Sequence, residues 1–87
     1  MKASALQSAL SNVKNRHDLV LFIEVLKADL ISHEDQWENA TLSSFLEAMS
    51  EWTKNMDQYY KNANIHFDEN VSWRTIADIL MAARIYE

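Results

Sequence analysis

The three histidines are the side chains of this sequence best suited to binding a metal ion or moving a proton near neutral pH. His17, His33 and His66 are far apart in the chain, and none belongs to a close pair such as H-E-x-x-H. Glu34 and Asp35 follow His33 directly, but adjacent residues on a loop seldom converge on one ion. Cysteine is absent, which excludes disulfides and thiolate ligands. The sequence therefore predicts no metal site.

Residue patterns for nucleophilic and acid–base catalysis are equally absent. A nucleophile elbow depends on glycine, and the chain contains none. Glu47 and Glu51 stand four residues apart and could in principle share acid–base work. Charged residues at this spacing are, however, the usual outer surface of an amphipathic helix. We expect no catalytic residue, no cofactor and a protein that is not an enzyme.

The charge is strongly uneven along the chain. The net charge is −5, and all thirteen acidic residues come after position 17. The charged residues among residues 1–17 are all basic. Proteins that bind nucleic acid need a basic surface to displace counterions from phosphates. The acidic body of this chain favours a basic protein partner instead, with no nucleic acid bound.

Length and composition restrict the fold to one small helical domain. The 87 residues suffice for a single domain, and the absence of both glycine and proline favours helices over tight turns. Apolar runs such as Leu19–Ile23 are far too short to span a bilayer, and the N-terminus has no apolar core of the signal-peptide type. We therefore expect a cytoplasmic protein without a membrane segment.

Hydrophobic periodicity predicts three main helices and a weaker one before them. The main helices are expected over Arg16–Ile31, Leu42–Lys61 and Trp73–Tyr86, with N-caps at Asn15, at Asn39 or Thr41, and at Ser72. The weaker segment, Ala3–Ser11, is too short to be stable alone and must dock on the others. The predicted fold class is all-α: a small bundle of three main helices in one domain, residues 1–87, with residues 1–13 as a docked N-terminal segment.

Each main helix carries an apolar face that should be buried. On the first helix this face comprises Leu19, Phe22, Ile23, Leu26 and Leu30. On the second it comprises Leu42, Phe45, Leu46, Met49, Trp52, Met56 and Tyr60. On the last it comprises Trp73, Ile76, Ala77, Leu80 and Ala83. Trp37 lies in the polar connection between the first two main helices and is expected to fold back onto the core, because tryptophans are mostly buried.

A second apolar stripe on the first helix leaves two interpretations open. This stripe consists of Leu21, Val25 and Ala28. If Leu6, Leu10 and Val13 of the N-terminal segment cover it, the protein is a monomer. If it stays exposed, burial against a second copy would stabilise a homodimer, and the protein would have a structural or regulatory role.

The acidic residues and one tyrosine are the candidate contacts to a partner protein. Tyrosine is frequent at binding hot spots. The predicted partner-binding residues are Glu34, Asp35 and Glu38 of the connection, Glu47 and Glu51 of the second main helix, and Tyr59 beside them.

Several short motifs resemble a known family. They are W-E-N at Trp37–Asn39, T-L-x-x-F-L-x-A at Thr41–Ala48, M-D-Q-Y-Y at Met56–Tyr60, and A-A-R-I-Y-E at the end of the chain. The combination resembles a family of small, stand-alone bacterial proteins of unknown function, over residues 13–87. The resemblance implies a compact single domain and no assigned activity. By size and charge alone, the chain is also similar to bacterial immunity proteins, which neutralise toxins. The predicted function is non-enzymatic protein binding, and its concrete form is that of a toxin-immunity protein.

Overall fold

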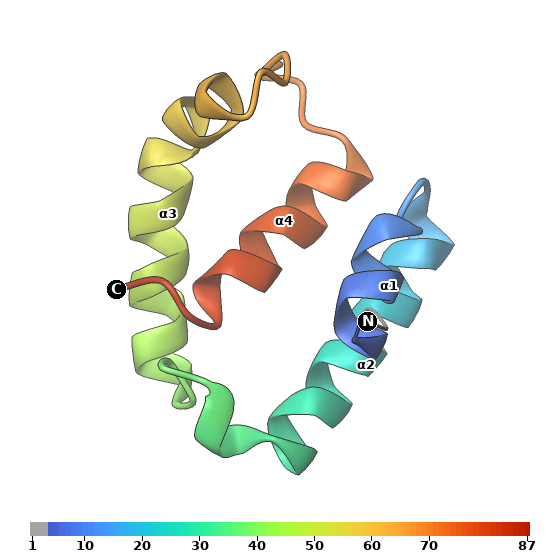
Figure 1. Ribbon diagram of the computed structural model, residues 1–87, viewed down its shortest axis with the longest axis vertical. Helices are drawn as coiled ribbons and strands as arrows, with labels where there is room; N and C mark the ends of the chain where they lie inside the picture. The colour runs from blue at the N-terminus through green and yellow to red at the C-terminus, as the bar shows by residue number, and fades with distance from the viewer. Residues whose placement is uncertain (1–3) are drawn as a thin grey trace.

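The computed structural model describes residues 4–87 and is built from four α-helices and one short 3-10 turn (Figure 1). These elements are α1 (Ala5–Ser11), α2 (Arg16–Ser32), η1 (Glu34–Gln36), α3 (Leu42–Asn62) and α4 (Trp73–Ala83). No strand occurs within residues 4–87, so the predicted all-α bundle is confirmed. Ala3, at the start of the predicted N-terminal segment, lies outside the described residues.

Each helix begins at a side chain that accepts a hydrogen bond from a free backbone N–H of its first turn. Ser4 caps α1, Asn15 caps α2, Thr41 caps α3 and Ser72 caps α4. The bond from the Ser44 N–H to Thr41 Oγ1 is 3.2 Å long. These caps satisfy donors that a helix cannot pair internally, so they fix where each helix begins. Of the two predicted caps for α3, the structure therefore selects Thr41.

The short helix α4 is the central element of the bundle. It packs against α1, α2 and α3, whereas the backbones of α2 and α3, described along their whole length, do not pack against each other. Figure 1 shows α4 running between α3 on one side and the α1–α2 pair on the other. Ala77 and Ala83 of α4 are fully buried, and their small side chains allow the neighbouring helices to approach closely.

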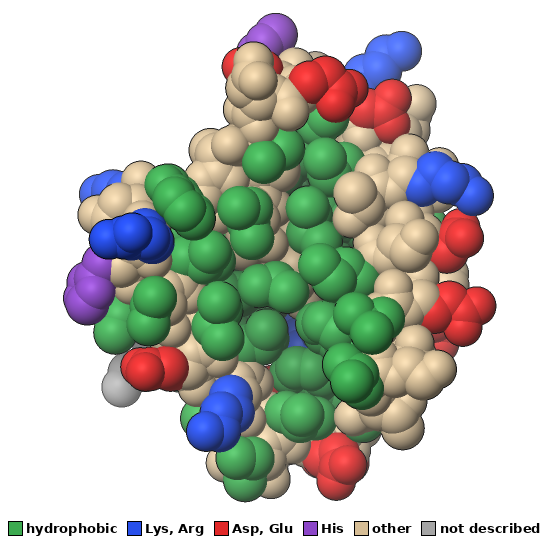
Figure 2. All heavy atoms as spheres, turned by 180° about the vertical axis from the view of Figure 1, so that it is seen from behind, with side chains coloured by type: hydrophobic (Ala, Val, Ile, Leu, Met, Phe, Trp, Pro, Cys, Tyr) green, Lys and Arg blue, Asp and Glu red, His purple; other side chains and the backbone are tan. Residues whose placement is uncertain are grey.

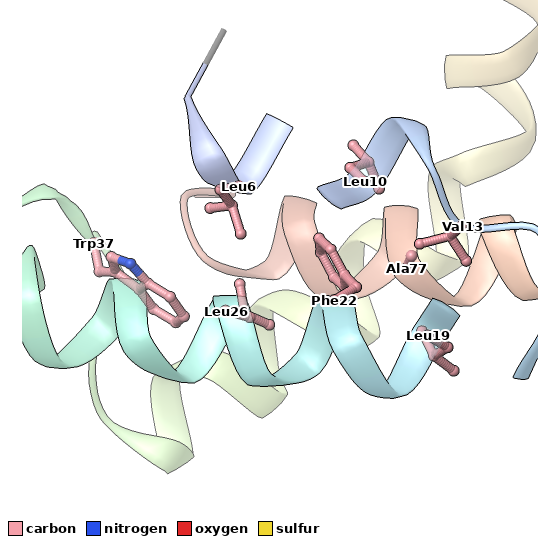
Figure 3. Close-up of a cluster of buried hydrophobic side chains, with 8 residues drawn as sticks. All are labelled: Leu6, Leu10, Val13, Leu19, Phe22, Leu26, Trp37 and Ala77. Carbon is pink, nitrogen blue, oxygen red and sulfur yellow. The ribbon is translucent and has the colours of Figure 1, made fainter. Parts of the chain in front are cut away.

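The hydrophobic core consists of two clusters on either side of α4. The larger one brings α1, α2 and α4 together around the fully buried Phe22 (Figure 3). Its buried members are Leu6, Leu10, Val13, Leu19, Phe22, Leu26, Trp37 and Ala77. The smaller one joins α3 to α4 and consists of Trp52, Met56 and Tyr60. α1 thus packs against α2 and α4, and the predicted burial of Trp37 is confirmed.

Four residues predicted on buried faces are instead exposed. Leu42 and Leu46 of α3 are 74% and 52% exposed, Ile23 of α2 is 44% exposed, and Trp73 of α4 is 42% exposed. The prediction was wrong for Ile23, Leu42 and Leu46 because periodicity identifies the apolar face of a helix but not what lies opposite it. Since α4 separates these helices, parts of their apolar faces have no helix opposite them. Trp73 is the first residue of α4 and follows the exposed loop 68–72.

The last helix is also shorter than its periodicity predicts, ending at Ala83 rather than Tyr86. Asn39, from the connection before α3, donates from Nδ2 to the carbonyl oxygens of Ala83 at 3.0 Å and Tyr86 at 2.7 Å. Its backbone N–H donates to the Arg84 carbonyl at 3.1 Å. Asn39 thus satisfies carbonyls that the end of a helix leaves unpaired, and it ties the C-terminal segment to the α3 connection.

This clamp predicts different effects for two substitutions of Asn39. Asn39→Ala removes two hydrogen bonds to part-buried carbonyls and should lower the free energy of unfolding by about 1–3 kcal/mol. Asn39→Asp should lower the free energy of unfolding further at pH 7, because a negatively charged carboxylate then faces two acceptor oxygens. Below about pH 4, where the carboxyl is protonated and can donate again, its deficit relative to the parent should shrink. Chemical denaturation at both pH values measures this.

The matched control is Asn55→Asp on the exposed surface of α3, which should change stability by less than about 0.5 kcal/mol. Equal effects of Asp at positions 39 and 55 would contradict the role of the clamp.

Candidate functional site

The predicted acidic contact residues are all exposed, and they come from two parts of the chain. Glu34 and Asp35 belong to η1, Glu38 follows it, and Glu47 and Glu51 lie on α3. Glu51 forms a 3.6 Å ion pair with Lys54, and both side chains are largely in solvent, where such pairs contribute little. These acids are therefore free to contact a partner, but no contact among them defines a binding site.

A hydrophobic groove, missed by the sequence interpretation, lies between α2 and the start of α3. It has a volume of about 300 Å³. Its apolar lining comprises Ile23, Leu26, Leu30, Trp37, Ala40, Leu42 and Phe45. The residues Lys27, Asn39 and Thr41 complete it. The groove exists because α2 and α3 do not pack directly, and no periodicity within a single helix reveals that.

The floor of the groove is held by Trp37. Its indole N–H donates to the Asp29 carboxylate at 2.7 Å, and its ring stacks on Phe45 with the ring centres 5.9 Å apart. A second bond, from the Trp37 backbone N–H to the Glu34 carbonyl at 3.0 Å, closes η1. Asp29 also lies 3.4 Å from His33 Nδ1. With its polar atoms satisfied, the Trp37 ring is fixed in place and the groove is preformed.

The groove belongs to a wider apolar surface. Figure 2 shows hydrophobic side chains in a broad band on the back of the molecule, over α4 and the flanking sides of α2 and α3. Charged side chains lie mainly around the edges of this band. Large contiguous apolar patches rimmed by polar residues are typical of interaction sites.

Acidic residues stand close to this groove in the chain. Glu38 lies between Trp37 and Asn39, two residues of the lining, and Glu47 follows the exposed Leu46. Two of the predicted contact residues are thus sequence neighbours of groove-lining or exposed apolar residues. Lys27 is the basic residue of the lining.

A second cavity, which we call the aromatic cleft, lies between α1, α3, α4 and the C-terminal segment 84–87. It measures about 570 Å³. Trp52, Tyr59 and Tyr86 contribute aromatic rings to it, and those of Trp52 and Tyr59 are 5.4 Å apart. Tyr59, predicted to contact a partner together with the acids, therefore belongs to this cleft and lies outside the groove.

A hydrogen-bonded network stands at the wall of the aromatic cleft. Tyr60 donates its hydroxyl proton to Asp78 Oδ2 at 2.7 Å, and Arg74 Nε donates to Asp78 Oδ1 at 3.0 Å. Burial raises the pKa of Tyr60 above the usual range for tyrosine, and the hydrogen bond to the Asp78 carboxylate raises it further. Both Asp78 oxygens are engaged, so the network is structural in character.

Two further findings bear on function. Within residues 4–87, no group of three histidine or carboxylate side chains is arranged to hold a metal ion. None of the described helices combines the length and the apolar character that crossing a bilayer requires.

Comparison with known proteins finds one family. A model described as "Family of unknown function (DUF7660)" matches residues 15–87. The match begins at the N-cap of α2 and includes α2, α3 and α4, whereas α1 precedes it. No curated protein and no solved structure matches the chain.

The raised pKa of Tyr60 predicts a loss of stability at high pH. In the unfolded chain this tyrosine ionises around its ordinary pKa of 10.0, whereas in the folded protein it keeps its proton. The free energy of unfolding should therefore fall as the pH rises above 10.0. Denaturation between neutral and high pH, compared with Tyr60→Phe, isolates this contribution. Tyr60→Phe should show a shallower decline, and Tyr59→Phe is the matched control; identical declines in the parent and Tyr60→Phe would contradict the assignment.

Proposed function

We propose that this chain, which belongs to the DUF7660 family of unknown function, is a non-enzymatic protein-binding domain. The observation that carries the proposal is the preformed hydrophobic groove between α2 and α3, open to solvent and lined mainly by apolar side chains. The proposed binding surface is this groove together with the exposed Leu46 beside it.

Burial of the exposed side chains would supply the binding energy. Ile23, Leu42 and Leu46 are each more than two-fifths exposed, and fully burying side chains of this kind is worth about 1.5–3 kcal/mol each. Trp37 is already ordered by its bond to Asp29, so its ring costs little further entropy when a partner docks. A groove with a rigid apolar floor and exposed apolar walls can accept a row of apolar side chains from a partner.

The partner that best fits is an amphipathic helix of another protein. Helices bind apolar grooves through residues at i, i+3, i+4 and i+7, which form one continuous face. The exposed Glu38 and Glu47 are sequence neighbours of Trp37 and Leu46, and the net charge is −5, so basic residues flanking that face would be attracted. A second copy of this acidic chain would bring like charges together, which disfavours self-association through the groove.

A toxin with a basic surface is the specific partner class that we propose from size and charge. This version makes the chain an immunity-type protein in the bacterial cytoplasm. Glu34, Asp35 and Glu51 would then contribute to attraction at longer range, and Tyr59 would serve as a contact away from the groove. It rests on analogy and on the acidic surface alone, whereas the groove stands on its geometry.

The alternative proposal is a homodimer that uses Leu21, Val25 and Ala28 of α2. In favour of it, Leu21 and the neighbouring Val20 are exposed. Val25, by contrast, is half-buried against the larger core cluster, and Val25 and Ala28 line a small cavity with Leu6 of α1. The docked α1 thus occupies part of the surface that a dimer would use.

The oligomeric state separates these two proposals. Sedimentation equilibrium at several concentrations should find a monomer, because α1 already packs on the second stripe of α2. Leu21→Glu should then leave the mass unchanged. A dimer that Leu21→Glu converts into folded monomers would instead favour the alternative.

Binding to the groove can be tested with a designed helical peptide of leucine and lysine, with leucine at i, i+3, i+4 and i+7. NMR titration of the full chain should shift the Trp37 indole N–H signal. Leu42→Gln, at an exposed groove position, should weaken binding about tenfold without unfolding the protein. Replacing lysine by glutamate in the peptide should also weaken binding, and added salt should reduce the difference.

The matched control is Ile65→Gln, an exposed apolar residue outside the groove, which should leave the affinity unchanged. Peptide binding that is insensitive to Leu42→Gln, or no binding at all, would contradict the proposal.

A further inference from the structure

The guanidinium group of Arg84 is an unpaired charge beside the aromatic cleft. Arg84 follows the last residue of α4 and is one of the cleft's lining residues. Its Nε atom is buried and lacks a hydrogen-bond partner, the sole buried side-chain nitrogen or oxygen of this kind in the part of the chain described. A buried donor without a partner lowers the stability of the folded protein, and the loss is larger when the group is charged. Buried polar groups are normally paired, so the unpaired Nε marks a guanidinium group that the protein itself leaves unsatisfied.

No carboxylate of the cleft supplies that partner. Asp78 is held by Arg74 and by the Tyr60 hydroxyl, which engage its two oxygens. Glu87, at the edge of the cleft, forms no ion pair with Arg84 within residues 4–87. Arg74 and Arg84 thus differ: the first cation is neutralised inside the protein, and the second is not. The cleft is therefore lined by an arginine that no carboxylate of residues 4–87 engages in an ion pair.

The other walls of the cleft fit a flat apolar group. Trp52, Tyr59 and Tyr86 contribute aromatic rings, and Leu10, Met81 and Ile85 contribute aliphatic surface. The volume of about 570 Å³ falls within the range usual for small-molecule sites. A ligand that uses both features has an aromatic ring and a single anionic group. Because the chain is acidic and Glu87 is nearby, a monoanion suits the cleft better than a multiply charged phosphate.

We propose that the aromatic cleft binds a small aromatic monocarboxylate, with the carboxylate on the Arg84 guanidinium and the ring against Trp52 and Tyr59. Guanidinium groups pair with carboxylates through two parallel hydrogen bonds. Since Nε of Arg84 is already out of contact with water, the cation is partly desolvated, which strengthens its attraction for an anion at its free edge. The cleft shares no lining residue with the hydrophobic groove, so this site stands independently of the proposed groove binding, although Tyr59 is also a proposed contact to a toxin.

Titration of the full chain with 3-phenylpropanoate tests the proposal. Two-dimensional NMR should show saturable shifts of the Arg84 Nε–H and Trp52 indole N–H signals at millimolar ligand. The neutral isostere 3-phenylpropanamide should bind at least about tenfold more weakly, because it cannot neutralise the guanidinium. Inorganic phosphate, which lacks the ring, should shift neither signal at the same concentrations.

Variants distinguish binding in the cleft from nonspecific binding of the ligand to any arginine or aromatic side chain on the surface. Arg84→Met keeps the aliphatic stem of the side chain, removes its charge and should weaken 3-phenylpropanoate binding at least about tenfold; Tyr59→Ala, at an exposed position of the cleft, should also weaken it. Arg16→Met, at the exposed first residue of α2, is the matched control and should leave binding unchanged. Equal binding of the amide, no shifts with the carboxylate, or unchanged binding in folded Arg84→Met would overturn the proposal. If Arg84→Met fails to fold, unchanged binding in Tyr59→Ala overturns it.

Discussion

The close packing of α4 against its neighbours is the contact on which the rest of the structure depends. Ala77 and Ala83 are fully buried, and their small side chains let α4 serve as the shared partner of α1, α2 and α3. Larger residues there would push the helices apart, because close-packed interiors do not absorb extra volume without strain. Since α2 and α3 are joined through α4 and not directly, both core clusters rely on this one short helix.

The open space between α2 and α3 is a consequence of the same arrangement. The connection between them places Trp37 on the larger core cluster and Asn39 on the carbonyls that follow α4. These two side chains close the bundle at one end while leaving the apolar sides of Ile23 and Leu42 in solvent. A surface of this kind reduces solubility unless something binds it, which is why we assign the protein-binding role to the groove.

The candidate sites could be predicted from the sequence only in part. The acids Glu38 and Glu47 were identified by charge, and they do stand next to the apolar surface in the chain. The groove itself could not be predicted, because Leu42 and Leu46 fit the same periodic face as the buried Trp52. Periodicity tells which residues share a side of a helix, but it does not tell what lies opposite. The Arg84 site was missed for a related reason: whether an arginine has a partner depends on side chains distant in sequence.

Local chemistry in the sequence determined the helices and their beginnings. Asn15 and Ser72 cap helices through bonds to residues three positions on, which any reader of the sequence can locate. The tertiary structure alone decided between Thr41 and Asn39, because Asn39 bonds to carbonyls more than forty residues away. It also decided that α4 ends at Ala83 and that α2 and α3 stay apart. Interactions within one helical turn are encoded locally, whereas the partner of an apolar face is chosen by the packing of the whole chain.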